Sequence, residues 1–192
     1  MVNYRRNRIT GGTYFFTVTL RDRQSAHLMH FIDNLRPAFR QHARPFQIDA
    51  IVVLPEHLHA IWTLPEGDDD YAGRWRMIKS HFTHALANLN APITRNAKGE
   101  YDLWQRRYWE HTIRDALDFE RHVDYIHYNP VKHGLVTQVA EWPHSSFHRY
   151  VREGKLPSDW LGTDAKDGRV GEIGEIGEAA SAINKRRHRQ PG

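Results

Sequence analysis

Two apolar runs, at residues 48–54 and 57–64, follow one another with only two residues between them. Short runs rich in apolar and β-branched residues predict strands, and so short a connection joins antiparallel neighbours in a hairpin. The second run alternates, so we expect His57 and His59 to point from the same face of its strand. Two imidazoles held side by side on a sheet make up two thirds of a divalent-metal site.

Further strands and helices are predicted on both sides of this hairpin. An aromatic and β-branched run at 14–20 predicts a strand before it, and residues 104–113 predict a short strand after it. Apolar residues at helical spacing predict three helices: one at 25–42, one that follows the loop after the hairpin, and one at 115–129.

Two prolines fall within these helical patterns. We expect Pro37 to kink the first helix and Pro130 to end the last one. The resulting order is strand, helix, strand, strand, helix, strand, helix. This order predicts an α+β fold, a ferredoxin-like antiparallel sheet with helices packed on one face.

The chain has 192 residues, which suits one domain with a tail. We expect the folded domain at residues 1–162 and a flexible tail at 163–192, where a glycine–glutamate repeat precedes a basic stretch and large apolar residues are few. The basic N-terminus is not followed by an apolar signal region, and no apolar run reaches about 18 residues. We therefore predict a cytoplasmic protein without a membrane partner. The absence of cysteine excludes disulfides and cysteine-based zinc sites.

The last predicted helix carries a tyrosine away from its apolar stripe. At about 100° per residue, the stripe comprises Phe119, Val123 and Ile126, whereas Tyr125 lies among polar residues. Asn129 follows Tyr125 by one turn, a spacing at which two side chains can address the same object. Its amide oxygen is a candidate third ligand for the ion at His57 and His59.

These residues favour attack by a phenol on a phosphodiester. A tyrosine with a pKa near 10 is only about 0.1% ionised at neutral pH, so it needs help to act as a nucleophile. A metal ion at the two histidines can polarise the phosphodiester. The product is a tyrosyl-phosphate ester, which conserves the bond energy and permits rejoining.

Five segments carry a resemblance to a known family. They resemble the REP-associated tyrosine transposases, bacterial single-tyrosine nucleases of the HUH type, and the similarity runs in order over about residues 4–160. The segments are residues 4–6, 11–18, 52–65, 108–111 and 122–134.

The resemblance implies an endonuclease and strand-transferase that acts on single-stranded DNA at hairpins from repetitive extragenic palindromes, with Mg²⁺ or Mn²⁺. It implies that His57 and His59 bind the metal and that Tyr125 forms a 5′-phosphotyrosine link. Asn129 stands where relatives often carry glutamine, as the third ligand. Tyr128 stays open as an alternative nucleophile. A nucleoid-associated location follows from the DNA substrate, and the choice between monomer and homodimer stays open.

Basic residues near aromatic ones suit contacts to a single-stranded backbone, and the net charge of +4 is compatible with a polyanionic partner. Three tryptophans, in contrast, are interpreted as core residues rather than stacking platforms: Trp62, Trp75 and Trp109. The candidate DNA contacts are Arg5, Arg6, Arg8, Arg74, Lys79 and Arg107.

Two other functions fit parts of the pattern. A domesticated module could bind structured nucleic acid without cutting it, although binding alone does not need the histidines, Tyr125 and Asn129. A metal-dependent hydrolase would need a carboxylate at a recognisable spacing to activate water, and none is evident. A histidine-triad hydrolase would need a histidine where the chain has Ile61.

Overall fold

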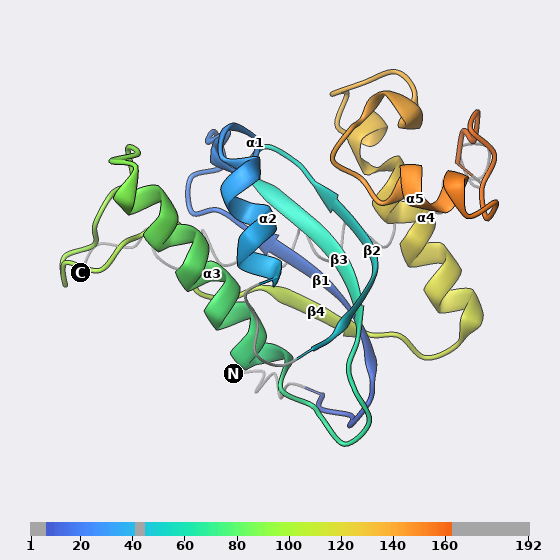
Figure 1. Ribbon diagram of the computed structural model, residues 1–192, viewed down its shortest axis with the longest axis horizontal. Helices are drawn as coiled ribbons and strands as arrows, with labels where there is room; N and C mark the ends of the chain where they lie inside the picture. The colour runs from blue at the N-terminus through green and yellow to red at the C-terminus, as the bar shows by residue number, and fades with distance from the viewer. Residues whose placement is uncertain (1–6, 41–44, 163–192) are drawn as a thin grey trace, which may run out of the picture.

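A four-stranded antiparallel sheet forms the centre of the computed structural model, which describes residues 7–40 and 45–162. The predicted tail at 163–192 lies outside the described residues. The spatial order of the strands is β2-β3-β1-β4 (Figure 1). Their bounds are β1 (Thr13–Thr19), β2 (Gln47–Val53), β3 (His57–Thr63) and β4 (Trp109–Thr112). The predicted α+β class, with an antiparallel sheet, is confirmed.

The helices are placed between and after these strands. Within the described residues, no helix is long and apolar enough to cross a membrane. The bounds are α1 (His27–His30), α2 (Ile32–Arg40), α3 (Tyr71–Asn88), α4 (Ala116–Lys132), the 3-10 turn η1 (Val139–Glu141) and α5 (Phe147–Arg152).

The helices cover both faces of the sheet, so the prediction that they pack on one face is wrong in this detail. One face packs with α2 and α3 and buries Phe16 and Trp62 with Trp75. The opposite face packs with α4 and buries Phe15 beside Ile126. In Figure 1, α2 and α3 lie to the left of the sheet and α4 and α5 to its right. The reason is that β1 is apolar at consecutive positions, and a strand that is apolar on both faces needs cover on both.

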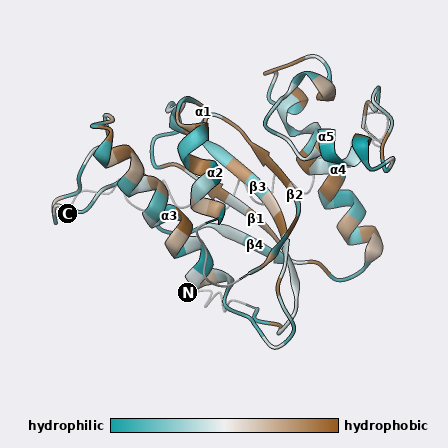
Figure 2. Ribbon diagram, in the orientation of Figure 1, coloured by the Kyte–Doolittle hydropathy of each residue, from teal (hydrophilic) through white to brown (hydrophobic). Residues whose placement is uncertain are grey.

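Hydropathy along the chain follows this arrangement. Figure 2 shows hydrophobic and hydrophilic residues interspersed along α4, as expected of a helix with one face on a core. Trp62 and Trp75 are fully buried, and their rings stack with centroids 4.2 Å apart. The interpretation of these two tryptophans as core residues is therefore confirmed, whereas Trp109 is only half-buried.

Strand register fixes the face on which the histidines lie. β1 pairs with β3 so that Thr17 lies opposite His59 and Thr19 opposite His57. Alternate residues share a face, so both histidines lie on the same face as Phe15, which is the face covered by α4.

The helices depart from the predicted boundaries in two places. The predicted helix at 25–42 breaks at Phe31, the C-terminal cap of α1, and Pro37 lies inside α2. Likewise α4 continues past Pro130 to Lys132.

The α4 terminus is set by a glycine rather than by Pro130. Gly134 has a φ of +66°, and its N–H donates to the carbonyl of Val131, while the N–H of Leu135 donates to that of Pro130. This pair of bonds is a Schellman motif, which caps the last carbonyls of the helix. Asn129 is consequently a helical residue, one turn beyond Tyr125.

Candidate active site

Side chains from β3 and α4 meet on the face of the sheet that α4 covers. The ring centroids of His57 and His59 are 4.9 Å apart, and those of His59 and Tyr125 are 5.1 Å apart. Phe15 stacks on His59 at 5.5 Å and lies 5.9 Å from Tyr125. The structure thus brings together the two histidines and the tyrosine that the sequence singled out.

The C-terminal half of α4 contacts the histidine pair at two positions, and Asn129 lies between these positions along the helix. Tyr125, Asn129 and His133 follow one another at intervals of one turn and so share a face of α4. The first of them contacts His59, and the last places its ring 5.2 Å from His57. Asn129 is fully buried, and it occupies the helical position between these two contacts.

Hydrogen bonds fix the orientation of both predicted metal-binding rings. Nδ1 of His59 is 2.9 Å from the Thr17 hydroxyl, and Nδ1 of His57 is 2.9 Å from Oε1 of Glu56. These hydrogen bonds leave Nε2 of each histidine as the ring nitrogen that can bind a metal ion. Metal-binding histidines are ordinarily held in this way, by a hydrogen bond from the nitrogen that does not bind the ion.

Burial and neighbouring cations keep His59 neutral. Its side chain is 1% exposed, and burial, followed by the charges of His57, His133, Lys132 and Arg23, holds the pKa of His59 well below its usual range. A neutral imidazole is the form that binds a metal ion.

Unpartnered buried atoms show that these residues fit a metal ion. Nε2 of His59 and both amide atoms of Asn129 are buried without a hydrogen-bond partner. Such atoms are rare because leaving one unsatisfied costs about 1–3 kcal/mol. Two imidazole nitrogens and an amide oxygen suit a borderline or hard divalent ion, so the donor set fits.

A second cluster could also hold a metal ion. His111 of β4 and Asp118 and His122 of α4 each offer one ligand atom, and these atoms lie within 4.8 Å of one another. The two imidazole rings stack with centroids 4.8 Å apart. Phe15 connects this cluster to the first site, since its ring lies 4.8 Å from that of His122.

The polar atoms of this second cluster already satisfy one another. Oδ2 of Asp118 lies 2.9 Å from Nε2 of His111 and accepts hydrogen bonds from the Arg114 backbone and guanidinium. Nδ1 of His122 donates to the Asp118 carbonyl at 2.7 Å. Burial alone would raise the pKa of Asp118, but these hydrogen bonds lower it to about 2. The geometry is that of an ion-pair network that fastens the first turns of α4 to β4.

Tyr125 is more buried than its polar neighbours in the sequence suggested. It is 1% exposed and belongs to the same core cluster as Val123 and Ile126. Tyr128 instead packs against a separate cluster that contains Phe147. Of the two tyrosines, therefore, Tyr125 is the one in contact with His59.

The predicted DNA contacts have different environments. Arg74 is 1% exposed, its guanidinium donates to both carboxylate oxygens of Asp68, and it also reaches the Asp70 and Pro45 carbonyls. A buried guanidinium with all these partners holds the loop before α3 in place, and this geometry favours a structural role for Arg74 over the predicted DNA contact.

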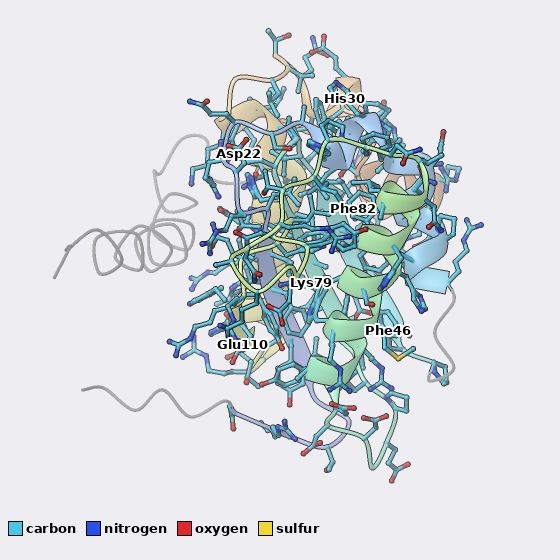
Figure 3. All side chains as sticks on the ribbon, turned by 90° about the vertical axis from the view of Figure 1, so that its left-hand side faces the viewer. Asp22, His30, Phe46, Lys79, Phe82 and Glu110 are labelled. Atoms are coloured by element: carbon cyan, nitrogen blue, oxygen red, sulfur yellow. The ribbon has the colours of Figure 1, made fainter. Side chains whose placement is uncertain are left out.

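Lys79 is also engaged within the protein. Its ammonium donates to the Gln105 carbonyl at 3.0 Å and lies over the rings of Trp104 and Tyr108. Figure 3 shows Lys79 between α3 and the segment that precedes β4. This geometry favours a structural role for Lys79.

The other basic candidates remain predictions. Arg8 and Arg107 are exposed, and Arg8 lies 3.9 Å from Asp69. Arg5 and Arg6 lie outside the described residues.

The sequence reasoning missed several residues that surround the histidines. Glu56 and Thr17 orient the rings, and Lys132 and His133 lie at the end of α4 beside them. His133 could have been found from its spacing, because it continues the one-turn interval from Tyr125 to Asn129. Thr17 could not, since its role depends on the pairing of β1 with β3.

Comparisons with known proteins agree with this fold. No family model matches the sequence. The chain is 53% identical over 164 residues to the REP-associated tyrosine transposase of Escherichia coli, covering 84% of this chain and 92% of the relative. It is 46% identical over 166 residues to a putative REP-associated tyrosine transposase of Haemophilus influenzae, covering 84% and 94%.

A solved structure shares both sequence and fold with the chain. It is a REP-associated tyrosine transposase bound to a REP hairpin, with 52% identity and a TM-score of 0.75, and the match covers 84% of this chain and 92% of that one. Sheet, helices and relatives together define an α+β protein of a transposase and nuclease class. The chain belongs to the family of REP-associated tyrosine transposases.

Proposed function

We propose that this protein is a metal-dependent endonuclease and strand-transferase that acts on single-stranded DNA carrying REP-type hairpins, through a 5′-phosphotyrosine intermediate. The observation that carries the proposal is the contact between the Tyr125 and His59 rings, 5.1 Å apart, beside the unpartnered amide of Asn129. The hairpin substrate is supported by the relative of 52% identity that was solved bound to a REP hairpin.

The chain's own residues account for the proposed transesterification. The Tyr125 oxygen attacks the scissile phosphorus, a P–O bond to the tyrosine forms, and the bond from phosphorus to the 3′ oxygen breaks. The phenolic proton passes to solvent and the departing 3′ oxygen takes one up, so no net proton is consumed. The 3′-hydroxyl can later attack the phosphotyrosine, which reverses the step and rejoins a strand.

His57, His59 and Asn129 would hold a Mg²⁺ or Mn²⁺ ion. When bound, the ion polarises the phosphodiester and stabilises charge on its oxygens. Glu56 and Thr17 keep the two rings oriented toward it. We assign the ion to these residues rather than to the cluster at His111, because the polar atoms of the latter are already satisfied.

Covalent trapping tests the reaction. The full-length protein is incubated with end-labelled single-stranded DNA that contains a REP hairpin and Mn²⁺, and denaturing gels report a protein–DNA adduct. We expect the adduct with the wild type and with Tyr128→Phe, and its loss in Tyr125→Phe with hairpin affinity unchanged. Reversible binding without an adduct would favour the non-cutting binding module, and loss in Tyr128→Phe alone would reassign the nucleophile.

Metal binding separates the two histidine clusters. We expect His59→Ala to lose Mn²⁺ binding, measured by electron paramagnetic resonance of the free ion, and His122→Ala to retain it. The opposite result would assign the ion to the cluster of His111, Asp118 and His122.

The cytoplasmic, nucleoid-associated location is proposed from the DNA substrate, and monomer and homodimer both remain open.

A further inference from the structure

Lys132 lies beside the candidate nucleophile. It follows Tyr125 by two helical turns on α4, and its ammonium lies 5.2 Å from the centroid of the Tyr125 ring. The side chain is exposed. Among the residues that the structure describes, no carboxylate lies within ion-pair distance of Lys132.

The same end of α4 lies beside the metal-binding side of the site, because the ring of His133, the next residue along the chain, lies 5.2 Å from that of His57. Arg23 is a second cation on this side, but it is paired at 3.5 Å with Glu56, the carboxylate that orients His57. Lys132 has no such partner among the described residues. A divalent ion held by the histidines would add two further positive charges. Like charges so close together repel unless an anion joins them, and the phosphodiester of a DNA strand is such an anion.

From this geometry we infer that Lys132 is a further catalytic residue, whose ammonium contacts a non-bridging oxygen of the scissile phosphate during attack by Tyr125. This inference rests on the proposed function and deepens it. The contact stabilises the negative charge that gathers on the phosphate oxygens as the bond to the tyrosine forms and the bond to the 3′ oxygen breaks. Lysine serves as a point charge for phosphate in this way.

The test compares reaction rate with binding. Single-turnover formation of the covalent adduct is measured with saturating full-length protein, Mn²⁺ and a labelled single-stranded oligonucleotide that contains a REP hairpin, and hairpin affinity is measured separately without metal. Lys132→Met keeps the apolar stem against the Tyr125 ring and removes the charge, and Lys132→Arg retains the charge. Lys155→Met is the matched control, because the Lys155 ammonium also lies over a tyrosine ring, 5.3 Å from that of Tyr150, but in another part of the fold.

We expect Lys132→Met to slow adduct formation by about 10²-fold, the usual effect of losing one preorganised charge-stabilising group, with hairpin affinity changed less than about threefold. Lys132→Arg should recover most of the rate, and Lys155→Met should match the wild type. Thermal unfolding of each variant verifies that the fold is intact, and Lys132→Gln replaces the methionine variant if it is not.

Three outcomes would overturn the inference. An adduct that forms at the wild-type rate in Lys132→Met removes the proposed role while leaving the proposed function in place. A loss of rate that is matched by an equal loss of affinity, without recovery in Lys132→Arg, makes Lys132 a binding or packing residue. An absence of adduct in the wild type refutes the proposed function, and this inference with it.

Discussion

The charge of Asp118 should stabilise the fold in a manner that depends on pH. Hydrogen bonds from His111 and Arg114 overcome the effect of burial and lower the pKa of Asp118 from 3.8 to about 2. Lowering a pKa by one corresponds to about 1.4 kcal/mol, so the ionised carboxylate contributes about 2 kcal/mol at neutral pH. Asp118→Asn preserves the shape of the side chain and removes this contribution.

The sign follows from the depressed pKa. Above pH 4 the carboxylate is ionised in the folded and unfolded chains, and the full contribution is present. As the pH falls toward 2, the unfolded chain takes up a proton before the folded one, and the contribution is lost. We expect Asp118→Asn to lower the free energy of unfolding by about 2 kcal/mol at pH 7 and by about half of that near pH 3.

Urea unfolding of both proteins at the two pH values measures this difference. Glu153→Gln is the control, because Glu153 is an exposed carboxylate whose ion pair within the described part of the chain is with Lys155 alone, and we expect no measurable change from it. An equal destabilisation by Asp118→Asn at both pH values would refute the assignment to charge. A difference that appeared only with added Mn²⁺ would instead make the cluster of His111, Asp118 and His122 a metal site.

Three further changes test other parts of the structure. Arg74→Ala should lower the free energy of unfolding by about 3 kcal/mol, since it leaves the partners of a buried guanidinium without their hydrogen-bond donor. Arg76→Ala, at an exposed position, should not lower it. If Arg74→Ala were as stable in urea as the wild type, the structural role of Arg74 would be refuted. Gly134→Ala should cost about 1 kcal/mol, because φ is +66° and no atom lies near the added Cβ, and an unchanged melting temperature would contradict this. Burial, then the charges of Arg149 and His148, lower the pKa of His127 to about 3. Between about pH 6.5 and 3, His127 is therefore protonated only in the unfolded chain, and the free energy of unfolding falls as the pH falls. His127→Gln should weaken this pH dependence in urea titrations at pH 7 and 5, and an unaltered dependence would disprove the assignment to His127.

Local patterns were sufficient for the parts of the site that lie close together in the sequence. The two-residue connection and the alternation at His57 and His59 predicted the hairpin and the shared face, because a strand has a fixed side-chain period. The one-turn spacing of Tyr125 and Asn129 was predicted in the same way. Pro130 misled the prediction of the helix end at residue 129, since Gly134, with its capping hydrogen bonds, sets the end of α4 at Lys132.

Features that depend on long-range packing escaped prediction. Arg74 has the sequence surroundings of a surface cation, and only the approach of Asp68 and the Pro45 carbonyl reveals that it is buried. The network at Asp118 likewise joins β4 to α4. Asp118 and His122 lie one turn apart on the helix, but no local pattern shows that His111 of β4 approaches them. Tertiary contacts decided these environments, and no local period encodes them.

The two-sided sheet explains how stability and chemistry are kept apart in this fold. Phe15 and Phe16 are neighbours in sequence but belong to different cores: Phe16 packs with Trp62 and Trp75, and Phe15 contacts His59, His122 and Tyr125. The face under α2 and α3 contains the larger cluster of buried apolar residues. The face under α4 therefore has room for histidines and an asparagine whose buried polar atoms lack partners, because the opposite core stabilises the strands that position them.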